Sequence, residues 1–189
     1  MSLEDYRAKR DFGKASEPEG ERAGEGGDRF VVHEHHASRL HFDFRLEMDG
    51  VLKSWAIPKG PSMNPADKRL AVMVEDHPLD YIDFRGEIEE GNYGAGAVEI
   101  WDSGTYSVTE GALDSGKLVI EIAGGKLKGR FSLVQLRGKG KDWLLIKGRD
   151  GFADPDWKLE QVLPGGSRRQ REELKNGGRE GMGPETSSG

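Results

Sequence analysis

The sequence predicts a mainly β protein: a compact, closed antiparallel β-barrel with little helix, a flexible N-terminal arm and a disordered C-terminal tail. The 189 residues include 28 glycines without a three-residue period, which indicates many tight turns. Apolar and polar residues alternate in short segments, separated by turn signals such as Asp49-Gly50 and Gly124-Gly125. Many short strands at this spacing favour a barrel or a sandwich, because closure or face-to-face packing removes exposed sheet edges.

The chain divides into an arm, a body and a tail. Residues 1–28 hold few large apolar side chains and end in a Gly/Glu-rich run, so their composition favours a flexible arm. Residues able to anchor this arm are Leu3, Tyr6 and Phe12. Residues 29–163 form the expected barrel. Residues 164–189 have too few apolar side chains to order themselves, and we expect a disordered tail.

Ten strands are expected in the body. They lie near residues 30–33, 39–48, 51–57, 69–76, 84–89, 97–102, 105–109, 117–123, 127–136 and 142–148. Ser103-Gly104 is interpreted as the turn between two of them. The run Gly91–Gly96 is interpreted as a tight turn, because it lacks the Lys-Ser/Thr of a phosphate-binding P-loop. The four tryptophans are expected to pack in the core or at its rim.

The strand over residues 39–48 has the clearest pattern. Its core face is formed by Leu40, Phe42, Phe44, Leu46 and Met48. Its other face collects Arg39, His41, Asp43, Arg45 and Glu47. A solvated polar face is the plain interpretation of such a pattern. Two imidazoles near an Asp are unusual for a solvated face, however, and favour a functional site.

His41 and Asp43 can converge on one cation, because side chains at i and i+2 of a strand begin about 7 Å apart on the same face. His35 has the same parity and would join them from the preceding turn. Two imidazoles and one carboxylate leave coordination positions open, which suits catalytic manganese, zinc, iron or cobalt. Arg45 lies next on this face, where its forked guanidinium could grip phosphoryl oxygens.

His33 and His36 are expected to be surface residues. A second strand, residues 69–76, places Leu70, Val72 and Val74 on the core face and leaves Met73, Glu75 and His77 on the other. Glu75 and His77 could therefore complete the site. Tyr81 follows within reach as a phenolic hydrogen-bond donor.

The amino-acid composition limits the kinds of reaction and binding site that the protein can have. The chain has no cysteine, which excludes disulfides, thiolate zinc sites and catalytic thiols. Its net charge of −6 argues against a general polyanion-coating protein, although residues 126–149 are strongly basic and could hold a nucleic-acid backbone. No apolar stretch approaches the roughly 20 residues that span a bilayer. We therefore expect a soluble, cytoplasmic protein without a membrane partner.

Taken together, HEHHASRLHFDFRLEMDGVLKSWAIPKGPS and KRLAVMVEDHPLDYIDFRGEIEEGNYGAGAVEIWDSGTY resemble the 3′-phosphoesterase module of the bacterial DNA repair ligase D family. The resemblance extends over about residues 6–163. It implies a compact β-barrel that trims 3′ ends of a primer strand during end joining. Such a module first removes a terminal ribonucleoside, leaving a 3′-phosphate, and then removes that phosphate.

The resemblance also implies roles for individual residues and for partners. The metal ligands would be His35, His41 and Asp43, and the metal would be manganese, with zinc, cobalt or another transition metal as alternatives. Catalytic positions would be Arg45, His77, Glu75 and Tyr81, joined by Arg10, Asp11 and Glu17 from an arm that folds over the site. Partners would be DNA or RNA–DNA primer-template 3′ ends, with a separate ligase, polymerase and end-binding repair proteins for recruitment.

Two other functions remain open from the residues alone. A cupin-like metal oxygenase also uses a β-barrel with two His and a carboxylate, although Arg45 and the basic stretch speak against it. A nucleic-acid-binding barrel without catalysis is the other alternative. Metal-dependent release of phosphate would separate the phosphoesterase from both.

Overall fold

A computed structural model describes residues 2–10, 17–18, 27–138 and 140–163 of the chain. Within these residues one α-helix, α1 (Leu3–Ala8), precedes the strands, and two 3₁₀ turns, η1 (Leu79–Asp83) and η2 (Leu113–Ser115), interrupt them. The strands are β1 (Arg29–His36), β2 (Leu40–Met48), β3 (Val51–Ile57), β4 (Lys68–His77), β5 (Gly86–Ile88), β6 (Gly96–Ala112), β7 (Lys117–Gly124), β8 (Lys128–Gln135) and β9 (Asp142–Lys147).

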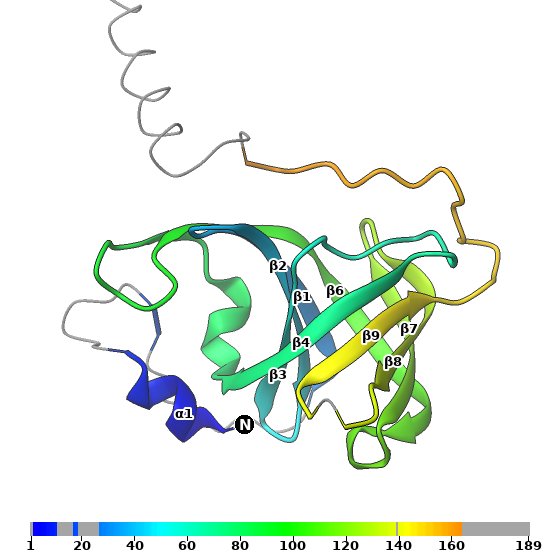
Figure 1. Ribbon diagram of the computed structural model, residues 1–189, viewed down its shortest axis with the longest axis horizontal. Helices are drawn as coiled ribbons and strands as arrows, with labels where there is room; N and C mark the ends of the chain where they lie inside the picture. The colour runs from blue at the N-terminus through cyan, green and yellow to red at the C-terminus, as the bar shows by residue number, and fades with distance from the viewer. Residues whose placement is uncertain (1, 11–16, 19–26, 139, 164–189) are drawn as a thin grey trace, which may run out of the picture.

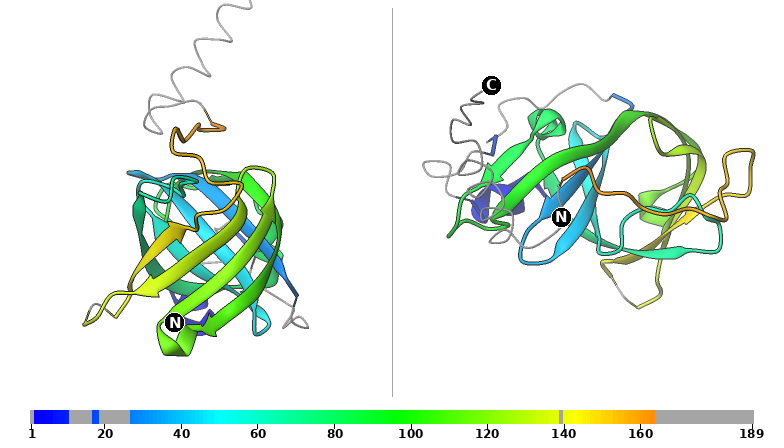
Figure 2. Two further views of the ribbon diagram at one scale, coloured as in Figure 1. Left: turned by 90° about the vertical axis from the view of Figure 1, so that its right-hand side faces the viewer. Right: turned by 90° about the horizontal axis from the view of Figure 1, so that it is seen from above.

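The strands close into an antiparallel barrel (Figure 1). The sheet order is β1-β2-β3-β4-β9-β8-β7-β6-β5, and a further pairing of β1 with β6 closes an eight-stranded ring. The short strand β5 lies outside this ring, along the first residues of β6. The left view of Figure 2 shows β7, β8 and β9 side by side. The predicted mainly β, closed antiparallel barrel is therefore confirmed.

The long strand β6 differs from the prediction of two strands with a hairpin turn at Ser103-Gly104. Its first part pairs with β1 and its second part with β7, so the chain passes from one neighbour to the other without a turn. Gly104 lies at this change of partner, opposite Gly124, and a Cβ there would overlap the carbonyl oxygen of Ala123. Glycine here permits close strand approach, not chain reversal.

Large apolar side chains fill the barrel. The alternation along β2 is confirmed, because Phe42, Phe44 and Leu46 are buried in the core, with Leu40 and Met48 packed against it. Trp55, Trp101 and Trp143 are also buried there, and Trp157 packs against them, as expected. Burying a side chain of this kind stabilises the fold by about 1.5–3 kcal/mol. Side chains therefore fill the barrel interior. A ligand-binding site is then expected on the outer face of the barrel.

The predicted core face of β4 is wrong. Ala71 and Met73 face the core, whereas Leu70 is 41% exposed. The pairing of β3 with β4 contains an irregularity: Ser54 pairs with Val74, but Leu52 pairs with His77, so β4 has one extra residue. The extra residue lies between Val74 and His77 and reverses the parity of the residues after it, so Leu70 and His77 both lie on the outer face. Sequence alternation alone could not locate that extra residue.

A second apolar cluster lies on the outer face of the barrel. It consists of Tyr6, Val31, Leu52, Leu79, Tyr81 and Ile82. It joins α1 and η1 to β1 and β3, and Figure 1 shows α1 on the opposite side of the barrel from β7 and β8. The fully buried Tyr6 holds the helix in place and donates its hydroxyl to the Pro18 carbonyl. A segment that composition alone suggests is flexible therefore includes a packed helix.

The segment after β9 crosses one end of the barrel. The buried carboxylate of Glu34 accepts hydrogen bonds from the backbone N–H groups of Val162 and Leu163 at 2.8 and 2.7 Å. It also contacts Nε2 of His36 at 2.8 Å. His36 is 2% exposed, so its expected surface location is wrong. It faces inward because it has the same parity as the core residues of β1.

No helix in the described part of the chain is long and apolar enough to cross a bilayer.

Candidate metal and phosphate site

A cavity of about 530 Å³ lies on the outer face of the barrel. Its lining draws on β1, β2 and β4, on η1, and on the described parts of the arm. Of the ten predicted site residues, nine line it together: Arg10, Glu17, His35, His41, Asp43, Arg45, Glu75, His77 and Tyr81. Asp11, the tenth, lies outside the described residues. The structure thus gathers into one cavity residues that the sequence spreads over three segments.

The hairpin of β1 and β2 holds the three candidate metal ligands. His35 lies directly opposite His41 in the antiparallel pair, and the two ring centroids are 4.6 Å apart. Nδ1 of His35 is 3.4 Å and Nε2 of His41 is 3.3 Å from the carboxylate of Asp43. One ligand atom from each of the three lies within 4.8 Å of the others. His35 belongs to β1 itself, which runs to His36, and not to the expected turn.

Backbone carbonyls orient both imidazole rings. Nε2–H of His35 donates to the Gly94 carbonyl at 2.6 Å, which leaves the lone pair of Nδ1 directed at Asp43. Nδ1–H of His41 donates to the Arg39 carbonyl at 3.2 Å, so in the neutral ring the lone pair of Nε2, 3.3 Å from the same carboxylate, is available to a cation. Metal-binding histidines are commonly fixed in this way by a hydrogen bond from their other ring nitrogen. The donor set of these residues therefore fits a divalent transition metal.

Asp43 and His41 shift each other's pKa. Burial opposes ionisation of Asp43, but the charges of His41 and Arg45 outweigh it and hold the pKa of Asp43 well below its ordinary value. Burial likewise opposes protonation of His41, yet the charge and hydrogen bond of Asp43 outweigh burial and raise the pKa of His41. The carboxylate is thus ionised, and its neighbours are groups that stabilise negative charge.

Arg45 lies beside the three ligands, almost completely buried. Its Nε donates to Nδ1 of His33 at 3.1 Å, and its Nη2 is 3.4 Å from the Asp43 carboxylate. The guanidinium carbon lies 4.8 Å from the centroid of the Tyr81 ring. Nη1 is buried without a hydrogen-bond partner among the described residues. A buried charged donor without a partner is costly, which indicates that an acceptor from a ligand belongs there.

His33 contacts Arg45, a cavity-lining residue, and the sequence interpretation missed this contact. It is completely buried, so its expected surface location is wrong. Burial first, and then the charge of Arg45, lowers the pKa of His33 to about 3, which keeps the ring neutral and able to accept from Arg45. Its parity along β1 is the same as that of His35. That parity was the available signal, but it requires β1 to extend as far as His36.

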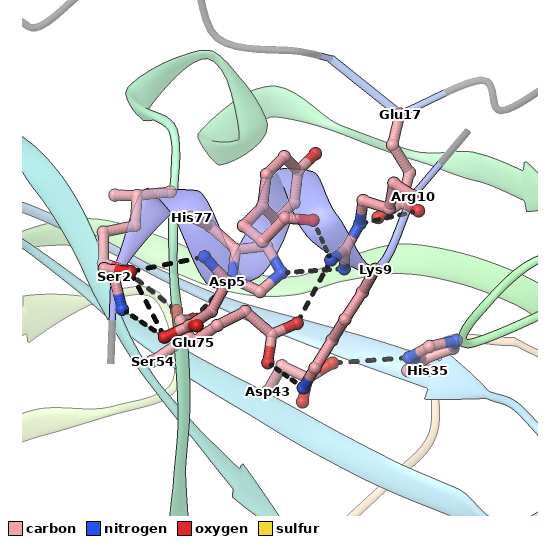
Figure 3. Close-up of polar contacts among 12 residues, drawn as sticks. Ser2, Asp5, Lys9, Arg10, Glu17, His35, Asp43, Ser54, Glu75 and His77 are labelled. Atoms are coloured by element: carbon pink, nitrogen blue, oxygen red, sulfur yellow. Dashed lines mark hydrogen bonds and ion pairs between the residues drawn. The ribbon is translucent and has the colours of Figure 1, made fainter. Parts of the chain in front are cut away.

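The arm contributes a compact set of ion pairs (Figure 3). Arg10 is 3.1 Å from the carboxylates of both Glu17 and Glu75, through Nε and Nη1 respectively. Lys9 contacts the other oxygen of Glu75 at 3.0 Å. Burial opposes the charge of Glu75, but hydrogen bonds from its own backbone and from Lys9 and Arg10 outweigh it and lower the pKa of Glu75. Glu75 therefore ties the arm to β4 as a charged carboxylate.

His77 lies between Tyr6 and Tyr81, with both ring centroids 4.7 Å from its own. Nδ1–H donates to the Glu75 carbonyl at 2.9 Å, and Nε2 accepts from Arg10 Nη2 at 3.4 Å. Burial, and then the charges of Arg45 and Arg10, hold the pKa of His77 well below its ordinary value. Burial raises the pKa of Tyr81 well above its ordinary value. His77 is thus a neutral acceptor and Tyr81 a protonated phenol.

The glycine-rich run Gly91–Gly96 is a turn, as expected, but it also forms part of the cavity wall. Gly94 has φ +74° and supplies the carbonyl that orients His35. Tyr93 lines the cavity and is 50% exposed, and the centroid of its ring lies 4.9 Å from Nζ of Lys9. The prediction of a turn is confirmed. The role of the Gly94 carbonyl could not be predicted, because every residue carries a backbone carbonyl and the sequence does not show which one accepts a hydrogen bond.

The basic stretch of residues 126–149 does not reach the cavity. None of its residues lines the cavity within the part of the chain that the structure describes. Lys147 faces the interior, where it donates to the Asp150 carboxylate at 2.7 Å and lies over the Phe131 ring. The stretch is therefore not one continuous basic surface beside the site.

The fold and site together define a β-barrel protein with a candidate metal and phosphate site on its outer face. The chain belongs to the DNA ligase D 3′-phosphoesterase domain family, whose profile matches residues 33–135. This confirms the resemblance seen in the sequence.

Curated relatives agree with this family. The multifunctional non-homologous end joining protein LigD of Pseudomonas aeruginosa is 50% identical over 159 residues, which are 80% of this chain and 19% of that protein. The LigD of Mycolicibacterium smegmatis is 44% identical over 78% of this chain and 21% of its own length. The LigD of Mycobacterium tuberculosis is 46% identical over 84% of this chain and 21% of its own length. The chain thus spans about a fifth of the length of these relatives.

Proposed function

We propose that this chain is a divalent-metal-dependent phosphoesterase that processes the 3′ ends of DNA or RNA–DNA primer strands. The observation that carries the proposal is the buried Nη1 of Arg45, which has no partner among the described residues and lies beside three candidate metal ligands. A guanidinium next to a metal suits a phosphoryl group, because the two can neutralise charge on different oxygens.

Two hydrolytic reactions are proposed in sequence. In the first, water adds to the phosphorus that joins a terminal ribonucleoside to the primer, and the bond to the 5′-oxygen of that nucleoside breaks. The products are a free nucleoside and a primer 3′-phosphate. In the second, water displaces the 3′-oxygen of the primer, which leaves a 3′-OH and inorganic phosphate. In both steps the leaving oxygen takes up one proton, and water supplies it overall.

His35, His41 and Asp43 would hold the metal, with manganese as the first candidate and zinc, cobalt or another transition metal as alternatives. When bound, such a cation supplies positive charge opposite phosphoryl oxygens and acidifies water. Arg45 would bind a non-bridging phosphoryl oxygen through Nη1 and resist rotation through its other contacts. These residues would act mainly on the charge that builds up in the transition state.

The remaining site residues have complementary proposed roles. Tyr81 would donate its phenolic hydrogen to phosphate or to the leaving oxygen, because its raised pKa keeps it protonated. His77 does not offer such a donor, because its single ring proton is on Nδ1 and is bound to the Glu75 carbonyl. We therefore assign Nε2 of His77 as an acceptor that orders Arg10 or receives a proton.

The proposed setting is end joining, since the matched relatives carry that name. A separate ligase, a polymerase and end-binding repair proteins are the proposed partners. Recruitment by partners would also explain why the described part of the site has no long basic surface of its own.

The test is a labelled primer-template that ends in one 3′-ribonucleotide, incubated with the protein and Mn²⁺. We expect loss of one nucleoside to give a 3′-phosphate, followed by conversion to a 3′-OH, and no reaction in excess EDTA. A primer ending in a deoxyribonucleotide should react much more slowly. An unchanged primer, or binding without cleavage, would support the non-catalytic barrel, and oxidised products would support the oxygenase.

A further inference from the structure

His33 and Arg45 contact each other on the outer face of the barrel, beside the candidate metal ligands. His33 on β1 is 0% exposed, and Arg45 on β2 is 2% exposed. Nε of Arg45 donates to Nδ1 of His33 at 3.1 Å. Because Arg has only donors, Nδ1 of His33 must be the acceptor. The contact is therefore a buried hydrogen bond from a charged donor to a neutral acceptor.

Three groups together confine the guanidinium of Arg45. His33 holds its Nε, the Tyr81 ring lies 4.8 Å from its central carbon, and Asp43 lies 3.4 Å from its Nη2. The His33 and Tyr81 rings also pack edge to face, with centroids 5.4 Å apart. The fixed Nε leaves the guanidinium with one orientation, in which Nη1 has no described protein partner.

Without His33, a different pairing becomes favourable. An arginine beside a carboxylate prefers a bidentate contact with two parallel hydrogen bonds. Arg45 and Asp43 instead make a single contact at 3.4 Å in this structure. A bidentate pair would turn Nη1 away from substrate and engage oxygens of Asp43 that a metal needs. The neutral Nδ1 of His33 competes with Asp43 for Nε of Arg45. Arg45 therefore stays available to phosphate, and Asp43 stays available to the metal.

We propose that His33 is a positioning residue for Arg45: it fixes the guanidinium so that Nη1 remains available to a phosphoryl oxygen. This inference rests on the proposed phosphoesterase function. His33 itself touches neither substrate nor metal in this account. Its contribution is to the orientation of Arg45, so it acts on turnover more than on folding.

Two substitutions of His33 separate orientation from packing. His33→Leu fills much of the same volume but removes the acceptor, whereas His33→Asn keeps an oxygen near the position of Nδ1. We expect kcat of the Leu variant to fall about 10–100-fold, as for other residues that orient a catalytic group, while the Asn variant stays within about threefold of wild type. The affinity for Mn²⁺, measured by calorimetry, should stay unchanged in both, because His33 is not one of the three candidate ligands.

His36→Asn is the matched control. It replaces a buried histidine on the same strand that faces the barrel interior and pairs with Glu34. This control should lower the melting temperature without lowering kcat at a temperature where the protein is folded. If His33→Leu behaves like the control, or if the Asn and Leu variants lose kcat equally while folded, the positioning role is wrong.

A second readout does not depend on catalysis. In the metal-free wild-type protein, the Nε–H proton of Arg45 should give an NMR signal protected from exchange with water, because it is buried and hydrogen-bonded. That signal should persist in His33→Asn and disappear in His33→Leu. An unprotected signal in wild type would overturn the inference. Inactivity of wild type on every phosphate substrate would instead overturn the proposed function, and the signal tells the two failures apart.

Discussion

Two parts of the candidate site differ in how the chain brings their residues together. The hairpin half, defined as His35, His41, Asp43 and Arg45, comes from two adjacent strands and one tight connection. The arm half, defined as Arg10, Glu17, Glu75 and His77, depends on contacts between residues far apart in sequence, such as Arg10 with Glu75, 65 positions away. Pairing of β1 with β2 is enough to build the first half, whereas the second needs α1 to dock on the finished barrel.

This difference separates two properties of the site. The hairpin half has the donor set for a metal and stands on strands whose other faces are packed in the core. The arm half is held by ion pairs and by one buried aromatic anchor, Tyr6. Metal affinity should therefore depend on the hairpin half alone, and turnover should depend on both halves.

The largest effect is expected from His41→Ala, which removes a ligand from the hairpin half. Activity should fall by on the order of a thousandfold or more, because a bound cation is worth several kcal/mol of transition-state stabilisation. The barrel should stay folded, since His41 is on the outer face and its loss opens no core cavity. Calorimetric titration with Mn²⁺, turnover and thermal melting check the three parts. Full activity without bound metal would contradict the ligand assignment.

The second-largest loss of activity is expected from Arg45→Lys. An ammonium keeps the charge but cannot contact His33, Asp43 and phosphate at once, as the planar guanidinium can. We expect kcat/KM to fall about 100-fold, the typical cost of losing one aligned donor to a transition-state charge. Steady-state kinetics on a 3′-phosphate primer measures this. Near-normal turnover by the lysine variant would show that a simple positive charge is sufficient.

A still smaller effect is expected from Glu75→Gln, which weakens the arm half and leaves the hairpin half intact. The amide keeps the shape but loses the charge that holds Lys9 and Arg10, so turnover should fall about tenfold with unchanged Mn²⁺ affinity. Lys9→Ala is the control, because the side chain of Lys9 is 39% exposed and such ion pairs contribute little. If both variants lose activity equally, Arg10 is not the important partner of Glu75.

The hairpin half could be predicted from sequence because it follows from a single rule. Alternation along residues 39–48 assigns Phe42 and Phe44 to the core and therefore His41 and Asp43 to one outer face. The same rule applied to β4 failed at Leu70, because residues 70–74 are apolar on both parities and the bulge that reverses the parity lies beyond them, between Val74 and His77. Glu75 and His77 were still assigned to the site, although the reasoning used the wrong parity for the strand.

The arm half could not be predicted from composition. An average over residues 1–28 hides the fact that one buried tyrosine and a few charged residues are enough to hold a short helix against the barrel. Long-range partners such as Glu75 and His77 become visible only in three dimensions. The resemblance to a known family pointed to Arg10 and Glu17 where composition did not, and it did so without a physical reason for their contacts. The Gly94 carbonyl remained invisible to both, because any residue carries a carbonyl.

The hairpin half is expected to bind metal independently, while the arm half is expected to be needed for turnover. The most direct test is a chain that begins at Asp28, compared with the full-length protein for Mn²⁺ affinity and for trimming of a ribonucleotide-ended primer. A chain that ends at Leu163 is the control for shortening itself. We expect the chain from Asp28 to remain folded and to bind Mn²⁺ with unchanged affinity, but to lose activity about 100-fold or more, because Arg10 and Glu17 are absent. Trimming at the full-length rate, or loss of Mn²⁺ binding by the folded chain, would contradict the account.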